Sequence, residues 1–269
     1  SASDDFYGAN RVGDNLFANS IVALDARTGK RRWHFQVVRH DVWDRDLPAP
    51  PVLGTVLRDG EPVDAVIQIT KSGHVFVLDR DTGESLFPLR EVPVQPSEVP
   101  GEQLADTQVL PVLPKPFARQ SIDESTLTDR TPEAAAHVRA ALDNTTIGGQ
   151  FIPPSTRAQA IFPGFDGGGE WGGPAFDPDT RLLYVNANEM PWLLKLDEKQ
   201  PLPAGADAAD VYDALCAPCH GADRKGSGDF PGLENLAERM EHEAFTRLLQ
   251  TGRGRMPSFD AHFDWRARE

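Results

Sequence analysis

The sequence contains little cysteine, methionine or tyrosine: its 269 residues include only two, three and three of them. Because Cys216 and Cys219 are the only thiols, a disulfide framework is excluded as the main source of stability. No apolar run approaches the roughly 18 residues that a membrane-spanning helix needs, so no transmembrane segment is predicted. Neither a starting Met nor a leader pattern is present, which indicates that Ser1 is a processing site or a cut end.

Basic residues are also scarce, with 27 Lys and Arg against 41 Asp and Glu and a net charge of −14. This balance argues against nucleic acid as a partner, because binding it requires basic patches that replace the counterions of the phosphates. The acidic surface leaves two explanations open. It either attracts a positively charged partner or simply keeps the protein soluble.

Turn-forming residues are plentiful, with 23 Gly and 23 Pro, which favours a turn-rich β protein. A strand–turn–strand pattern occurs three times, around turns at residues 25–29, 79–83 and 177–180. Each turn starts with an Asp, whose carboxylate accepts hydrogen bonds from the backbone of the turn. Gly29 and Gly83 end the first two turns, where a positive φ closes a hairpin.

These two glycines are roughly 50 residues apart, a spacing typical of the blades of a β-propeller. About three blades are visible, whereas a closed propeller needs at least about four. The chain is therefore either part of a larger propeller or an open stack of sheets. Residues 88–165 break the pattern with proline-rich stretches, and only residues 132–144 are predicted to form a helix there.

The character of the sequence changes after residue 197. Residues 198–205 form a polar stretch with prolines that is typical of a linker. Beyond it, residues 207–215 and 241–250 carry apolar side chains at helical spacing. The sequence thus predicts a mainly β domain over residues 1–197, a linker over 198–205 and a small all-α domain over 206–269.

Residues 216–220 read Cys-Ala-Pro-Cys-His. This spacing is the attachment signature of c-type haem, in which Cys216 and Cys219 add to the haem vinyl groups and His220 ligates the iron. Met256, in a Gly-Arg-Met-Pro loop, fits the second axial ligand, although a core methionine is the alternative. A zinc half-site and a redox-active Cys pair are less suitable interpretations, since no further Cys and no βαβ pattern accompany the motif.

Residues 206–269 resemble the class I cytochrome c domain, with a helix, the attachment motif, a glycine-rich loop, a middle helix and a methionine loop in the expected order. Domains of this class usually close with a C-terminal helix packed on the first one. Only residues 264–269 are available to begin such a helix, so the resemblance implies that the domain is incomplete at its C-terminal end.

A second group of chemically active residues lies in the front half. The loop from His40 to Asp46 crowds acidic and imidazole groups around a tryptophan, and Lys71 precedes a later strand. If Asp44 and Lys71 converge on one pocket, they suit a general base with an electrophilic partner; a structural ion pair is the alternative. His40 is predicted to be structural, and Asp41 and Asp46 to form turns or ion pairs.

Four segments, residues 15–25, 33–48, 71–80 and 162–178, resemble the membrane-type glucose dehydrogenase family, whose members use pyrroloquinoline quinone (PQQ). The likeness extends over roughly residues 6–197. It implies a mainly β fold, a partial eight-bladed β-propeller of the quinoprotein dehydrogenase type, followed by the small all-α cytochrome c domain.

The resemblance also implies roles for individual residues. Asp44 would be the catalytic base that takes the proton of the substrate hydroxyl, while a hydride passes to the quinone. Lys71 would hydrogen-bond the cofactor and Trp171 would line its pocket. A Ca²⁺ or Mg²⁺ ion would polarise the quinone, with ligands expected in blades outside this chain. Arg39 stands where many relatives have a histidine, so it is expected to add positive charge near the pocket.

Together these features predict a periplasmic quinohaemoprotein oxidoreductase. A sugar or alcohol would be oxidised with PQQ, and covalently bound haem c would relay the electrons to an external cytochrome, quinone or oxidase. The alternative is a non-catalytic c-type cytochrome module on a vestigial propeller scaffold. Asp44 and Lys71 are both retained, which favours the enzyme, although the missing blades make inactivity the expectation for these 269 residues alone.

Overall fold

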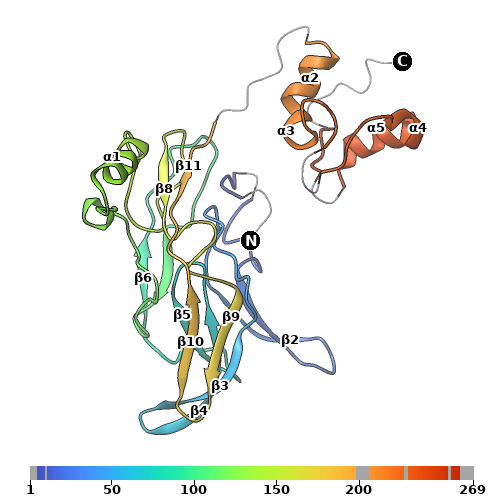
Figure 1. The fold of residues 1–269 in the computed structure, drawn as a ribbon. Coiled ribbons are helices and arrows are strands. Elements are labelled where there is room, and N and C mark those ends of the chain that lie inside the picture. Colours follow the sequence, from blue (N-terminus) through green and yellow to red (C-terminus); the bar gives the residue numbers. More distant parts are fainter. Residues whose placement is uncertain (1–4, 10, 198–205, 227–229, 254–255, 261–269) are drawn as a thin grey trace. The chain divides into compact units, whose positions relative to one another are not determined.

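The computed structural model describes residues 5–9, 11–197, 206–226, 230–253 and 256–260 (Figure 1). The chain divides into two compact units, residues 1–198 and 199–269. The sequence-based interpretations of Ser1, the linker 198–205 and the closing stretch 264–269 lie outside the described residues. None of the described helices is long and apolar enough to cross a membrane.

The first predicted hairpin forms as expected. Strand β1 (Ser20–Leu24) pairs antiparallel with β2 (Arg31–Gln36). Between them the Asp25 carboxylate accepts hydrogen bonds from the backbone N–H of Thr28 at 2.9 Å and of Arg27 at 3.1 Å. Gly29 takes a φ of +68°, the positive value that a hairpin turn of this kind requires.

A three-stranded sheet forms the centre of the first unit. It contains β3 (Val52–Arg58), β4 (Glu61–Ile69) and β5 (Val75–Asp79) in that order. The second predicted turn begins at the end of β5, where Asp79 accepts hydrogen bonds from the backbone of Thr82 and Asp81. Its return strand does not form beyond an isolated bridge between Leu78 and Ser85.

The third predicted hairpin is β9 (Gly169–Asp177) paired with β10 (Leu182–Ala187), and β9 also packs against β3 and β4 (Figure 1). Gly54 in β3 allows this approach, because a Cβ there would lie 2.6 Å from the ring of Phe176 in β9. The packed apolar side chains form one of the buried clusters of the unit, with Ile67, Ile69, Val75 and Val77 at its centre.

The region 88–165 is more ordered than its prolines suggest. It contains β6 (Leu89–Pro93), β7 (Thr107–Pro111) and β8 (Gln159–Ile161), of which β6 pairs with β7 and β8 pairs with β11 (Trp192–Leu194). The strand–turn–strand pattern is interrupted here, as predicted, but these three strands were not predicted. Pro93 and Pro111 are tolerated because each stands at the end of its strand, where a missing N–H costs little.

Two short helical segments interrupt this region: η1 (Glu124–Thr126) and α1 (Pro132–Ala141). Helix α1 begins where the sequence predicts it, with the Thr131 hydroxyl accepting a hydrogen bond from the backbone N–H of Ala134 and Pro132 in the first turn. It ends at Ala141, three residues before the predicted boundary at 144.

The second unit is helical, as predicted. It consists of α2 (Ala208–Leu215), α3 (Ala217–His220), α4 (Leu236–Arg239) and α5 (His242–Thr251). Asp207 begins α2, because its carboxylate accepts hydrogen bonds from the backbone N–H groups of the first turn. Gly252 ends α5 with a φ of +67°.

Candidate functional site

The loop after β2 is held by one buried carboxylate. Oδ2 of Asp41 accepts a hydrogen bond from Nδ2 of Asn19 and one from the backbone N–H of Arg45, both at 2.8 Å. Its Oδ1 accepts from the backbone N–H of Trp43 at 2.9 Å. Asp44 stands between Trp43 and Arg45, the two residues whose N–H groups are bonded to Asp41. Its φ is +54°, and these hydrogen bonds stabilise that conformation.

The buried Trp43 and His40 fix the same loop on either side of the carboxylate. The indole N–H of Trp43 donates to the carbonyl of Ile152 at 2.8 Å. His40 contacts the Gly13 carbonyl through Nδ1 at 2.8 Å and a carboxylate oxygen of Glu102 through Nε2 at 2.9 Å. The structural roles predicted for His40 and Asp41 are thus confirmed.

Lys71 lies in the connection between β4 and β5, where the loop 167–168 covers its backbone. The N–H of Gly168 donates to the Lys71 carbonyl at 2.6 Å. A Cβ on Gly167 would lie 2.5 Å from Cγ and 2.9 Å from Cα of Lys71, so only glycine fits there. The glycine-rich segment before Trp171 therefore positions Lys71, a tertiary contact that the sequence did not reveal.

Three carboxylates converge on the ammonium group of Lys71. Its Nζ lies 2.6 Å from Oδ1 of Asp46, 3.1 Å from Oδ2 of Asp44 and 3.6 Å from Oε1 of Glu170. The Lys71 side chain is only 9 % exposed, and the three carboxylates are partly shielded from water. The structure thus brings Asp44 and Lys71 together and adds Asp46 and Glu170, whose ion pairs depend on how separate loops meet.

Burial and charge give the carboxylates of this site different proton affinities. Burial, together with the nearby Asp46, raises the pKa of Asp44 to about 6, despite the opposing attraction of Lys71. Burial alone would raise the pKa of Asp46, but the contact with Lys71 outweighs burial and lowers this pKa. Burial raises the pKa of Glu170. Burial disfavours the charged form of Lys71, yet Asp46 and Asp44 together raise its pKa.

Arg45 is an unexpected member of the loop. Its side chain is fully buried, and Nη1 donates to the carbonyl of Gly164 at 3.3 Å. Nε and Nη2 have no hydrogen-bond partner within the described part of the chain. Burial lowers the pKa of Arg45 to about 10, while Asp41 and Asp44 favour its charged form. The loop therefore places a buried positive charge close enough to Asp44 to interact with it.

Trp171 follows Glu170 in β9, so its side chain points to the opposite side of the strand. It is 81 % exposed, the most exposed tryptophan among the described residues. Its place in a cofactor pocket stays a prediction.

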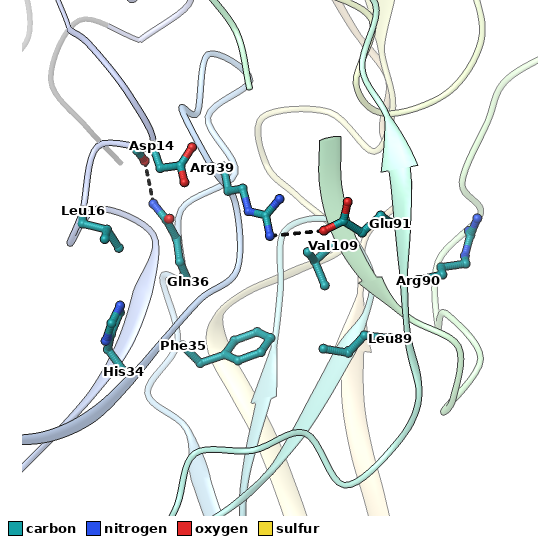
Figure 2. A pocket seen from close by; sticks show the side chains of 10 residues that line it. All are labelled: Asp14, Leu16, His34, Phe35, Gln36, Arg39, Leu89, Arg90, Glu91 and Val109. Carbon is teal, nitrogen blue, oxygen red and sulfur yellow. Dashed lines mark hydrogen bonds and ion pairs between the residues drawn. The ribbon is translucent and has the colours of Figure 1, made fainter. Parts of the chain in front are cut away.

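A separate pocket lies between β2 and β6 (Figure 2). Its volume is about 500 Å³, and neither Asp44 nor Lys71 lines it. Arg39 points into it, where Nη2 lies 3.5 Å from a carboxylate oxygen of Glu91 while Nη1 donates to the Thr107 hydroxyl. The positive charge of Arg39 is therefore paired with Glu91 of β6 and Thr107 of β7, and it is not part of the site around Lys71.

The second unit presents the attachment motif on a short helix. Cys216 and Cys219 are free thiols, and burial raises the pKa of Cys216. Nδ1 of His220 lies 2.8 Å from the carbonyl of Pro231. A carbonyl can only accept, so Nδ1 carries the proton and Nε2 is left with its lone pair for a metal. The orientation of His220 therefore fits a haem ligand.

Met256 lies just beyond α5, in a turn closed by two backbone hydrogen bonds with Arg253, at 3.0 and 3.1 Å. Gly252 makes this turn possible, because a Cβ there would lie 2.5 Å from the Met256 carbonyl oxygen. Ligation by Met256 itself stays a prediction.

Among the residues that the structure describes, no group of three or more His, Cys, Asp or Glu side chains could hold a metal ion. Asp44, Asp46 and Glu170 are already engaged by Lys71. The described residues therefore do not fit a complete Ca²⁺ or Mg²⁺ site.

These features define a two-part redox protein: a β-sheet unit with a lysine–carboxylate site and a helical unit with a haem attachment motif. The chain belongs to the family described as glucose/ethanol/alcohol dehydrogenase, beta-propeller domain, whose model matches residues 1–221. A second model, cytochrome C oxidase, cbb3-type, subunit III, matches residues 203–269. The predicted family and the mainly β propeller-type fold with a cytochrome c domain are thus confirmed.

The curated relatives are several times longer than this chain. A quinate/shikimate dehydrogenase (quinone) of Acinetobacter baylyi is 36% identical over 203 residues, which cover 75% of this chain and 25% of the relative. A quinoprotein glucose dehydrogenase of Gluconobacter oxydans is 36% identical, covering 73% and 24%, and that of Escherichia coli 34% identical, covering 73% and 25%. The chain spans about a quarter of the length of these relatives.

One solved structure is also similar to this chain. The quinohemoprotein alcohol dehydrogenase from Comamonas testosteroni is 26% identical with a TM-score of 0.45, covering 72% of this chain and 24% of that one.

Proposed function

We propose that this chain is part of a quinohaemoprotein oxidoreductase that oxidises a sugar or alcohol with PQQ and relays the electrons through covalently bound haem c. The observation that supports this most is the convergence of Asp44 on Lys71 within a chain of the PQQ-dependent family. A vestigial scaffold has no need for a half-buried carboxylate with a raised pKa next to a buried lysine.

The residues of the first unit supply a base and a hydrogen-bond donor. PQQ, when bound, supplies a carbonyl carbon that accepts a hydride from the substrate. Asp44 takes the proton of the substrate hydroxyl at a carboxylate oxygen, and Lys71 donates a hydrogen bond to the cofactor. Trp171 offers its exposed ring as one wall of the pocket. We assign no step to Ca²⁺ or Mg²⁺, because the described residues do not fit such a site.

The residues of the second unit hold the electron carrier. Cys216 and Cys219 would hold haem through thioether bonds, and Nε2 of His220 and the sulfur of Met256 would ligate its iron. Bound haem would supply one-electron transfer to an external acceptor, a cytochrome, quinone or oxidase. The covalent haem and the family both favour the periplasm as the location.

The class of substrate is open within limits that the relatives set. Relatives at 36% identity are named for quinate or shikimate and for glucose, which are ring-shaped polyols. We therefore favour a cyclic or sugar-like polyol.

An absorption spectrum of the full natural protein tests this function. The sample would receive PQQ, Ca²⁺ or Mg²⁺, and a panel of glucose, quinate and simple alcohols. We expect the bands of reduced c-type haem only when cofactor, metal and one of the substrates are all present. The Asp44→Asn variant is the matched control, which dithionite should reduce but no substrate should. Reduction of the wild type by dithionite alone would favour the electron-transfer module instead.

A further inference from the structure

The site around Lys71 carries more negative charge than its lysine can balance. One ammonium group faces Asp44, Asp46 and Glu170 within 3.6 Å. Arg45, Asp41 and Asp5 are further charged groups whose fields reach these side chains. Arg45 adds one buried positive charge, whereas Asp41 and Asp5 add negative charge. Carboxylates this close together and partly removed from water do not all ionise easily, so one of them retains a proton.

The geometry identifies the pair that shares this proton. Asp44 and Asp46 flank Arg45 in the same loop, and both side chains point to Lys71, whereas that of Arg45 points to Gly164. Their carboxyl groups lie within hydrogen-bonding reach of each other. Two carboxylates cannot hydrogen-bond without a proton, because each ionised oxygen only accepts.

The distances to Nζ show which carboxylate remains ionised. Asp46 lies 0.5 Å closer to the ammonium than Asp44, at 2.6 Å against 3.1 Å. Lys71 hydrogen-bonds Asp44, but the shorter contact with Asp46 favours the negative charge there, in line with the lowered pKa of Asp46 and the raised pKa of Asp44; below about pH 6 the proton therefore resides on Asp44.

We propose that Asp46 is a positioning residue for Asp44: it binds Lys71 as an ion pair and shares one proton with Asp44, which makes Asp44 the stronger base. This inference rests on the proposed function for its consequence in catalysis, but not for the shared proton itself. When Asp44 takes the hydroxyl proton of a substrate, the Asp46 carboxylate accepts a hydrogen bond from the new carboxyl group. The Asp46 charge thus stabilises the product of the proton transfer.

The substitution Asp46→Asn tests this role, because it removes the charge and keeps the shape. Without it, Lys71 faces only Asp44 and the more distant Glu170, and the midpoint of the Asp44 titration should fall by roughly one pH unit or more. Glu170→Gln is the matched control, since Glu170 carries the same charge at 3.6 Å from the same Nζ. It should shift the midpoint less than half as much. Asp46→Glu, which restores the charge, should return the midpoint toward the wild-type value.

The titration is measured directly on the full natural protein without PQQ. Infrared difference spectra of protein with ¹³C-labelled aspartate follow the carboxyl C=O stretch, and subtraction of Asp44→Asn isolates Asp44. The wild-type midpoint should lie near pH 6. An unchanged midpoint in Asp46→Asn, or an equal shift in Glu170→Gln, would overturn the proposal. If Asp46→Asn does not fold, a wild-type midpoint near the ordinary value for aspartate would overturn it as well.

Activity separates this inference from the proposed function. In the holoenzyme the acid limb of the kcat/KM profile should move to lower pH in Asp46→Asn, in step with the infrared midpoint. A shifted midpoint in a protein that oxidises no substrate refutes the function and leaves the proton sharing intact. Substrate oxidation with the same acid limb and midpoint in both proteins refutes the proton sharing and leaves the function intact.

Discussion

Substitution of Gly167 by alanine should impair the Lys71 site, whereas the same substitution at Gly29 should not. Gly167 and Gly29 have nearly the same backbone conformation, with φ of +69° and +68°. A Cβ at Gly29 meets nothing within 4 Å, whereas one at Gly167 would lie 2.5 Å from Cγ and 2.9 Å from Cα of Lys71. Gly29→Ala therefore measures only the strain of a positive φ, about 1 kcal/mol.

Gly167→Ala adds the displacement of Lys71 to this strain. Overpacking against backbone that has to move costs about 1–3 kcal/mol, so the total loss of stability should be about 2–4 kcal/mol. A Lys71 ammonium moved away from its carboxylates should also bind PQQ roughly tenfold more weakly, which corresponds to about 1.4 kcal/mol.

The two variants are compared in the full natural protein. Urea denaturation followed by tryptophan fluorescence reports stability, and titration with PQQ reports cofactor affinity. Equal effects of Gly167→Ala and Gly29→Ala on both measurements would refute the close contact between Gly167 and Lys71.

Three further outcomes follow from the two sites. Activity should fall as the pH drops through about 6, because the base must be ionised and burial raises the pKa of Asp44 to that value; a flat profile from pH 5 to 8 would exclude Asp44 as the base. Arg45→Met should leave the urea midpoint unchanged or raise it, because a buried charge with unpaired donors is removed. It should also move the acid limb to higher pH, whereas a large loss of stability would show that Arg45 is paired in the full protein. Met256→Ala should lower the reduction potential of the haem in a potentiometric titration, and an unchanged potential would show that another group ligates the iron.

Local patterns in the sequence predicted the local structure well. The Asp25 and Asp79 turns form because the hydrogen bonds of each turn come from residues two and three positions away. Strands β6 and β7 were not predicted, because a proline at the last position of a strand looks the same in sequence as one that breaks it. Whether a proline ends or breaks a strand depends on where it stands in the strand pair, and that place is known only once the partner strand is known.

The sequence predicted the central pair of the candidate site, but not all of the charged residues around that pair. Asp44 and Lys71 were identified through family resemblance, and the structure brings them to 3.1 Å. Asp46 was predicted as a turn-former or ion-pair partner, and it forms an ion pair with Lys71. Glu170 was not singled out, because its contact with Lys71 depends on how β9 meets the connection between β4 and β5. Arg45 was missed because an arginine in a charged loop is normally solvated. Burial of that side chain is a tertiary property with no signature in the sequence.

The anchoring of the loop by Asp41 has a consequence for experiments on the base itself. The backbone N–H groups of Trp43 and Arg45, the residues before and after Asp44, are bonded to Asp41, so these anchors of the loop do not involve the side chain at position 44. Asparagine, which tolerates the φ of +54° as aspartate does, can therefore replace Asp44 while these anchors stay in place, whereas alanine or glutamate would add backbone strain. Asp41→Asn is the opposite case, because an amide nitrogen would face a backbone N–H and dismantle the frame. Kinetic changes in Asp44→Asn thus report chemistry, whereas those in Asp41→Asn report geometry.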